Sequence, residues 1–68
     1  MILVTGATGF VGGHVVAALR SARKQVRCLV RDPRKASRLA SWGCELVEGD
    51  LTDAASLRRA VEGCDRVI

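Results

Sequence analysis

Three glycines carry the clearest chemistry in this chain, because Gly6, Gly9 and Gly12 are placed three apart directly after the apolar run 1–4. A strand that leads into glycines at this spacing, and then into a helix, is typical of a dinucleotide-binding turn. Gly6 lets the chain leave the strand through backbone angles that a side chain forbids. Gly9 allows close approach to a pyrophosphate, and Gly12 allows the helix to pack tightly. Free N–H groups at the helix start then bind the phosphates.

A basic segment follows the second predicted strand, at the place that selects between the two nicotinamide cofactors. An acidic residue there, about 20 positions beyond the turn, accepts hydrogen bonds from a free ribose hydroxyl, whereas a basic residue accommodates a 2′-phosphate. Arg31 comes first at this place and Asp32 second, followed by Arg34, Lys35 and Arg38. A planar guanidinium suits a phosphate. The segment therefore favours NADP over NAD through Arg31, with Lys35 as the weaker second candidate and an ordinary solvated helix start as the alternative.

Length, composition and charge limit the class of protein. The chain has 68 residues, of which 49% are hydrophobic and 26% charged, so it resembles a globular domain or a piece of one. Its net charge of +4 permits a nucleic-acid partner, but basic residues on solvated helix faces are the favoured explanation. No aromatic platform or helix-turn-helix pattern accompanies the charge. No apolar run approaches the roughly 18 residues that span a membrane. We expect neither a nucleic-acid nor a membrane partner.

The cysteines and the single histidine suggest no metal site. Cys28, Cys44 and Cys64 are odd in number and lack close spacing, and no secretory signal precedes them. Reduced thiols in a cytoplasmic protein are therefore expected, with Cys28 in the core. His14 has no partner at ligand spacing and is expected on the surface.

Strand and helix patterns alternate along the whole chain. Strands are predicted at 1–4, 26–30 and 45–48, and a fourth strand begins at 66–68. Helices are predicted from Gly9 to about Ser21, from Asp32-Pro33 to near Trp42, and after Asp53, which would cap the third helix, to Gly63, which would end it. In the first helix, Val11, Val15, Ala18 and Leu19 are expected to face the sheet, and in the second, Ala36, Leu39 and Ala40. This order predicts the first half of an α/β, Rossmann-type, doubly wound parallel sheet.

The domain organisation follows from that half. Residues 1–68 are expected to form one NAD(P)-binding Rossmann domain that is truncated, because the fourth strand is only begun. The fourth strand is expected to pair with the first, so the central first strand would be poorly covered, and its exposed edge favours self-association or poor solubility.

The three strings TGATGFVGG (5–13), VRCLVRDPRKA (26–36) and VEGDLTDAASLRRAVEGCDRVI (47–68) resemble the extended and atypical short-chain dehydrogenases/reductases. This superfamily includes NmrA-like proteins, NAD-dependent epimerases/dehydratases and dihydroflavonol-reductase-like enzymes. The resemblance covers the whole chain, and its glycine pattern is the TGxxGxxG form. It implies an N-terminal portion that binds a nicotinamide dinucleotide.

The resemblance also implies roles for individual residues. Those lining the pyrophosphate, mostly through backbone atoms, would be Gly6, Thr8, Gly9, Phe10 and Val11. The side chains of Phe10 and Val11 could equally belong to the core at the helix start. Arg31 would contact the 2′-phosphate, while Asp32 caps the next helix.

A third segment, 49–51, would border the adenine. There Asp50 would accept a hydrogen bond from the exocyclic amine and Leu51 would pack on the ring. The alternative is a simple turn in which Asp50 binds loop amides.

The acid–base chemistry of the superfamily depends on a tyrosine and a lysine four residues later, and this chain contains no tyrosine. We therefore expect no catalytic residue within residues 1–68. A small-molecule substrate would be bound only through further C-terminal sequence. The favoured function is the cofactor-binding N-terminal segment of an oxidoreductase or epimerase. The alternative is a non-catalytic, NmrA-like regulatory module that senses NADP.

Overall fold

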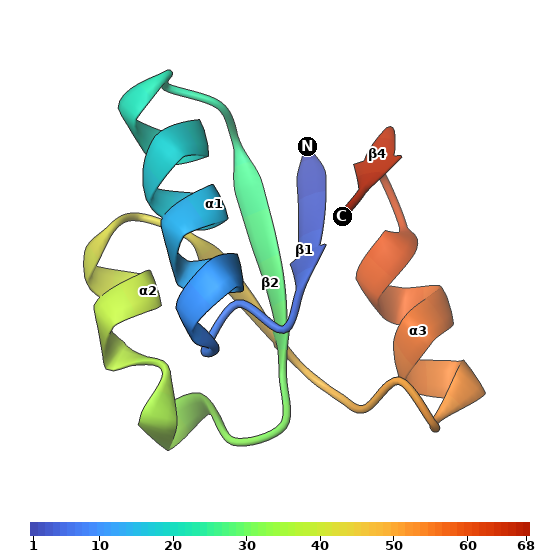
Figure 1. Ribbon diagram of the computed structural model, residues 1–68. Helices are drawn as coiled ribbons and strands as arrows, with labels where there is room; N and C mark the ends of the chain where they lie inside the picture. Colours follow the sequence, from blue (N-terminus) through green and yellow to red (C-terminus); the bar gives the residue numbers. More distant parts are fainter.

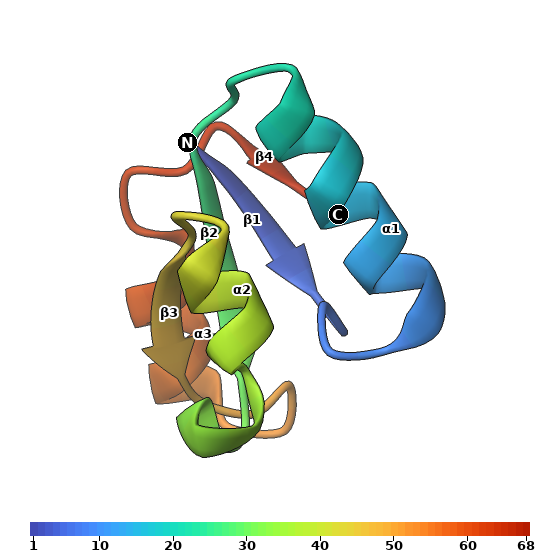
Figure 2. The same ribbon diagram turned by 90° about the vertical axis from the view of Figure 1, so that its left-hand side faces the viewer.

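The computed structural model describes residues 1–68 and forms a parallel sheet between two helical layers (Figure 1). Its elements are β1 (Ile2–Thr5), α1 (Phe10–Ser21), β2 (Val26–Val30), the 3₁₀ helix η1 (Pro33–Lys35), α2 (Ser37–Ser41), β3 (Glu45–Glu48), α3 (Ala54–Val61) and β4 (Arg66–Val67). The strand order is β3-β2-β1-β4. Helices α1 and α2 cover one face and α3 covers the other (Figures 1 and 2). The predicted α/β Rossmann-type sheet is confirmed.

Each face of the sheet has its own core, because side chains along a strand point alternately to opposite faces. Under α1 and α2, Cys28 of β2 packs in one buried cluster with Val16 and Leu39 of the helices. Under α3, Leu3 and Leu29 pack with Ala60. The strands are thus apolar on both faces, as expected for a parallel sheet.

The position of β1 corrects one expectation. Strand β1 is central, since it pairs with β2 on one side and β4 on the other. The N–H of Ile68 donates to the carbonyl of Leu3 at 2.8 Å, and the N–H of Thr5 donates to the carbonyl of Ile68 at 2.9 Å. The expected pairing of the fourth strand with the first is thus confirmed. The prediction that the first strand is poorly covered, with an exposed edge, was wrong, because these last residues complete its ladder. The open edges are β3 and β4.

The inward face of α1 differs in part from the expected one, although Leu19 packs against the core as predicted. Val16 is fully buried, whereas Val11 is 73% exposed, and Ala18 is exposed as well. The reason lies at Gly12, where an added Cβ would be 2.1 Å from the carbonyl oxygen of Gly6. Gly12 therefore faces the turn, and the residue one helical turn later, Val16, faces the sheet.

The second predicted helix is divided in two. The 3₁₀ turn η1 closes when the N–H of Ala36 donates to the carbonyl of Pro33 at 3.1 Å. The helix α2 then starts anew at Ser37. Ala36 and Leu39 are buried as expected, but Ala40 is exposed. The short 3₁₀ turn shifts the helical register, so that Ala40 points to solvent.

The expectations for Asp53, Gly63 and Cys28 are met. Asp53 caps α3 by accepting from the N–H groups of Ala55 at 3.0 Å and Ser56 at 3.4 Å. Gly63 follows that helix with φ of +77°, a conformation that favours glycine. Cys28 is fully buried in the core, and burial beside Cys44 raises the pKa of its thiol to about 12. None of the helices combines the length and apolar character needed to cross a bilayer.

Candidate functional site

The glycine turn between β1 and α1 leaves backbone donors open. Gly6 has φ of +65°, so the chain turns there through a conformation that favours glycine. Gly9 is the N-cap residue of α1, and no side chain caps the helix. The N–H groups of Phe10, Val11 and Gly12 consequently have no partner within the chain. Unpaired donors at the positive end of a helix form an anion-binding site.

The side chains at the start of α1 resolve one alternative. Phe10 is 83% and Val11 73% exposed, so neither belongs to the core. The ring of Phe10 meets that of His14 edge-on, with centroids 4.6 Å apart. His14 is exposed, as predicted. Its contact with Phe10 was missed, although the four-residue spacing on one helix could have indicated it.

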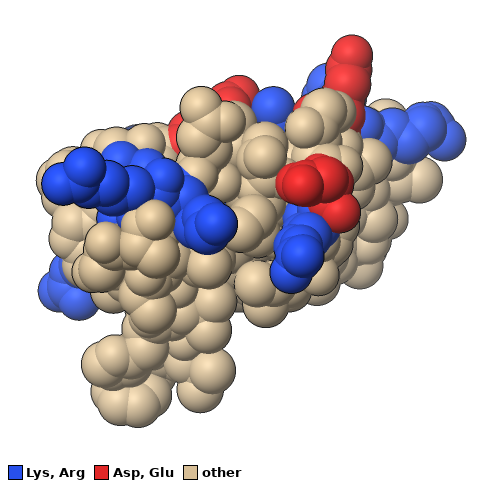
Figure 3. All heavy atoms as spheres, turned by 90° about the horizontal axis from the view of Figure 1, so that it is seen from above, with Lys and Arg blue, Asp and Glu red and all other residues tan.

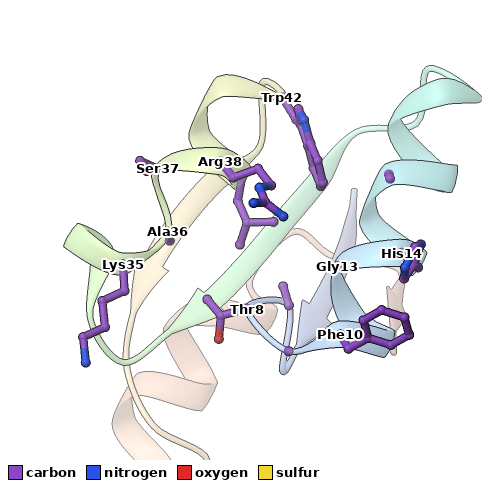
Figure 4. A pocket seen from close by; sticks show the side chains of 13 residues that line it. Thr8, Phe10, Gly13, His14, Lys35, Ala36, Ser37, Arg38 and Trp42 are labelled. Atoms are coloured by element: carbon purple, nitrogen blue, oxygen red, sulfur yellow. The ribbon is translucent and has the colours of Figure 1, made fainter.

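A groove with a volume of about 680 Å³ extends from the glycine turn between α1 and the segment 35–42 (Figure 4). Thr8, Gly9 and Phe10 line one end of it, and Lys35 lies across from Phe10 with Thr8 between them. The structure thus brings these four predicted residues together. The groove continues along residues that sequence reasoning had not placed in the site: His14, Ser37, Arg38 and Trp42.

The basic side chains at the end of β2 are free of internal partners. Arg31 is exposed and makes no hydrogen bond or ion pair within the chain, and the same holds for the ammonium of Lys35. Asp32 instead accepts from Arg34, both from its N–H at 3.0 Å and from its guanidinium. These bonds hold the pKa of Asp32 below its usual value. Asp32 is therefore the cap of η1, as predicted.

Asp50 and Leu51 lie beside Arg31 at the same edge of the sheet. Val30 pairs with Glu48, and the N–H of Gly49 donates to the carbonyl of Val30 at 2.9 Å, so β2 and β3 end together. The Oδ1 atom of Asp50 accepts from the N–H and the hydroxyl of Thr52, each at 3.0 Å.

Those bonds, more than the nearby charge of Arg31, lower the pKa of the Asp50 carboxyl. Asp50 thus accepts hydrogen bonds from its own loop, which was the alternative to a contact with adenine. Leu51 is 62% exposed beside it.

Ser56 of α3 fixes the loop that holds Asp50, a role that sequence reasoning missed. Its side chain is fully buried. The Ser56 hydroxyl donates toward the carbonyls of Asp50 at 3.0 Å and Asp53 at 2.9 Å, and accepts from the N–H of Asp50 at 3.0 Å. Gly49 permits this packing, since an added Cβ would lie 2.5 Å from the Cβ of Ser56. Only the tertiary contact reveals the role, because serine at a helix start usually indicates a cap.

The site can bind an extended anion. Open N–H groups lie at the glycine turn, unpaired cations follow β2, and an exposed apolar side chain next to a carboxylate follows β3. Along the chain, no group of three His, Cys, Asp or Glu side chains is arranged to hold a metal ion. The site therefore has binding groups suited to phosphate, ribose and base.

Known proteins support this interpretation. The chain is 46% identical to the photosystem II assembly factor Ycf39 of Cyanophora paradoxa over 67 residues, which is 98% of this chain and 21% of that protein. An NADPH-dependent quinone oxidoreductase from Escherichia coli superimposes with a TM-score of 0.88 at 36% identity, over 98% of this chain and 25% of that one.

A short-chain dehydrogenase/reductase superfamily protein from Agrobacterium tumefaciens, with bound NAD, gives a TM-score of 0.79 at 42% identity, over 98% of this chain and 19% of that one. The chain spans about a fifth of the length of the curated relatives that it matches. The profile of the NAD(P)H-binding family matches residues 6–68. The chain therefore belongs to the NAD(P)H-binding family, within the extended short-chain dehydrogenase/reductase superfamily that its motifs resemble.

Proposed function

We propose that this chain is the NADP-binding N-terminal segment of a reductase-like oxidoreductase or epimerase. The observation that carries the proposal is a glycine turn with open N–H groups, together with two unpartnered cations: Lys35, which lines the groove beside the turn, and Arg31, which follows β2 outside the groove lining. The pyrophosphate would bind the N–H groups of Phe10, Val11 and Gly12, where the helix dipole favours negative charge.

The 2′-phosphate would bind between the strand end and the groove. Arg31 presents a planar guanidinium with no competing partner, and Lys35 lines the groove across from Phe10. Figure 4 shows Thr8 between Lys35 and Phe10, where its hydroxyl is available to the same anion. Two cations and a hydroxyl suit a phosphate dianion better than they suit the free hydroxyls of NAD.

The adenine would lie at the end of β3. The hydrogen bonds from Thr52 reach only Oδ1 of Asp50, so Oδ2 is available to accept from the exocyclic amine. Leu51 is 62% exposed and offers an apolar surface to the ring. The loop role of Asp50 and its proposed role toward adenine are thus compatible.

The bound cofactor supplies hydride-transfer chemistry, while the residues of this chain bind and orient it. A tyrosine acid–base residue would have to come from sequence outside residues 1–68, since the chain has none. The substrate would bind there as well.

A regulatory role is the second candidate, because one relative at 46% identity is named an assembly factor rather than a reductase. In that case the same residues would bind NADP as a signal. A Tyr-x-x-x-Lys sequence in a longer protein that carries this segment would favour the oxidoreductase, and its absence would favour the regulator.

Calorimetric titration of the chain with NADPH and NADH tests the cofactor proposal. We expect tighter binding of NADPH, and we expect Arg31→Ala to weaken it about tenfold or more, since a charge-assisted hydrogen bond contributes about 1.5–3 kcal/mol. Arg58→Ala is the matched control, because it removes one exposed positive charge from α3, on the other face of the sheet.

Tighter binding of NADH would contradict the NADP assignment and would transfer the ribose contact to Asp32. A folded chain that binds neither nucleotide, judged by circular dichroism, would contradict the proposed function itself.

A further inference from the structure

The carboxylate of Asp32 is fully engaged by Arg34, two residues later. Its Oδ1 accepts from the N–H of Arg34 at 3.0 Å and from Nε at 3.1 Å, and its Oδ2 accepts from Nη2 at 3.3 Å. The guanidinium thus binds both oxygens in the paired geometry that arginine and carboxylate prefer. The side chain of Arg34 makes no other hydrogen bond or ion pair, and it is 90% exposed.

The position of this pair gives it a consequence for the cofactor. A carboxylate near the end of the second strand is the group that binds the free ribose hydroxyls of NAD, and a negative charge there repels a 2′-phosphate. Asp32 occupies this position, directly after Arg31. An unpaired Asp32 would therefore oppose the cation beside it.

We propose that Arg34 is a specificity-determining residue, which favours NADP by occupying both carboxylate oxygens of Asp32. The pairing leaves neither oxygen free for ribose hydroxyls and cancels the charge that would repel the 2′-phosphate. This inference rests on the proposed function, and it adds a residue that acts through Asp32 rather than by touching the nucleotide. Arg31 and Lys35 have no acidic partner and keep their charge for the phosphate.

The test compares Arg34→Ala with Asp32→Asn/Arg34→Ala by calorimetry with NADP⁺ and NAD⁺. In Arg34→Ala we expect weaker NADP⁺ binding and tighter NAD⁺ binding, which lowers the affinity ratio by roughly two- to fivefold, the size expected for an exposed ion pair. The double variant should return to the wild-type ratio. Asparagine lacks the charge but still caps the helix, so the comparison separates charge from folding.

Arg58→Ala again controls for the loss of a positive charge. Weaker NADP⁺ binding that Asp32→Asn does not restore would overturn the inference, because Arg34 would then contact the phosphate directly. An unchanged ratio in Arg34→Ala would overturn it too, while leaving the NADP proposal intact.

A readout without nucleotide makes the two proposals separable. Carboxyl titration by NMR should show the pKa of Asp32 rising toward its usual value of 3.8 in Arg34→Ala, because the two side-chain bonds are lost. An unchanged pKa would show that the pair does not form, and would overturn the inference whatever the chain binds. Failure of the wild type to bind either nucleotide would overturn both proposals.

Discussion

At the end of the sheet where the strands begin, arginine side chains are bound to the protein's own carbonyl groups. At the end where the strands finish, the arginine side chains that follow β2 bind no backbone carbonyl. Arg27 of β2 donates from Nη1 to the carbonyls of Ala60 at 2.8 Å and Glu62 at 2.5 Å. Arg20 donates from Nε to the carbonyl of Trp42 at 2.8 Å. By contrast, Arg31 has no internal partner.

Arg20 and Arg27 lie on opposite faces of the sheet, but both bind carbonyl groups at the C-terminal end of a helix. Arg20 binds the C-cap residue of α2, and Arg27 binds the last turn and the C-cap residue of α3. Carbonyls at these positions have no helical partner and carry partial negative charge. Arg27 is held further by Glu45, 3.3 Å from its Nε. These arginines therefore stabilise the fold.

This difference between the two ends bears on how the net charge of +4 is interpreted. Figure 3 looks onto the end where β1 begins and shows basic side chains on both flanks, with acidic ones among them rather than one continuous basic surface. Part of the positive charge, that of Arg20 and Arg27, is bound to carbonyl groups of the protein itself. The unpaired charge that lines the groove comes from the segment after β2, and that segment is where a phosphate would be attracted.

A substitution in the glycine turn, at the end of the sheet where the strands finish, should have the largest effect on stability. In Gly12→Ala the new Cβ would lie 2.1 Å from the carbonyl oxygen of Gly6, where only backbone can move. We expect a loss of about 3 kcal/mol, at the upper end for overpacking, from a total of roughly 3–10 kcal/mol for a chain of this size. Urea unfolding measures it.

Gly13→Ala is the matched control for this substitution. Its Cβ would be 3.6 Å from the nearest atom, the carbonyl oxygen of Ala7, so we expect a gain of up to about 1 kcal/mol from helix propensity. Equal losses in the two variants would show that the close approach at Gly12 is not the cause.

The comparison of the two ends is tested directly by Arg27→Met and Arg31→Met. Arg27→Met should lower the free energy of unfolding by about 2–3 kcal/mol, because carbonyls of α3 lose a charged donor. Arg31→Met should change it by less than about 0.5 kcal/mol, as is usual for exposed residues without partners, while weakening NADPH binding. Urea unfolding and calorimetry measure the two effects. Comparable losses of stability in both variants would remove the distinction.

How far the sequence predicts this molecule depends on the range of the contacts. The turn at Gly6 and the caps at Asp32 and Asp53 were predicted correctly, since each depends on neighbours in the chain. The open donors and cations of the site follow from the same local patterns. The alternation of strand and helix predicted the parallel α/β sheet, and the doubly wound fold predicted that the fourth strand pairs with the first.

The features that were missed depend on distant partners. Arg27 and Ala60 are 33 positions apart, and nothing near Arg27 indicates that it binds a helix end. The inward face of α1 was displaced because the approach of Gly12 to Gly6, rather than hydrophobic spacing, sets the rotation of the helix. The coverage of β1 by Ile68 depends on the pairing of the two ends of the chain.

Ser56 holds the loop of Asp50 in place, at the end of the sheet where the strands finish. Its hydroxyl bonds to both backbone groups of Asp50 and to the carbonyl of Asp53. Ser56→Ala leaves these groups without their partner, and we expect a loss of about 1–2 kcal/mol together with weaker NADPH binding. Hydrogen exchange of the Asp50 amide should accelerate.

Ser41→Ala is the control, since its hydroxyl donates to the carbonyl of Arg38 at the surface at 2.6 Å. That variant should change stability by less than about 0.5 kcal/mol. If Ser56→Ala weakens the fold without changing exchange at Asp50 or binding, the serine supports α3 alone.

The smallest expected effect concerns the acid titration of Asp50. Its pKa lies below the usual 3.8 mainly because the N–H and the hydroxyl of Thr52 donate to Oδ1, and to a lesser extent because of the charge of Arg31. A lowered pKa stabilises the folded state fully at pH values above the pKa of the unfolded chain, and this stabilisation is lost as the pH falls through the folded pKa. Thr52→Val removes the hydroxyl but keeps the N–H, so the pKa should rise part of the way toward 3.8.

Carboxyl titration by NMR measures this shift, and Arg31→Met provides the comparison. The rise in the pKa of Asp50 should be smaller in Arg31→Met than in Thr52→Val, because Arg31 acts only through its charge. A larger rise in Arg31→Met would mean that the guanidinium is bound to Asp50. Arg31 would then resemble Arg27, bound to the protein's own oxygen atoms, and its charge would be unavailable to a 2′-phosphate.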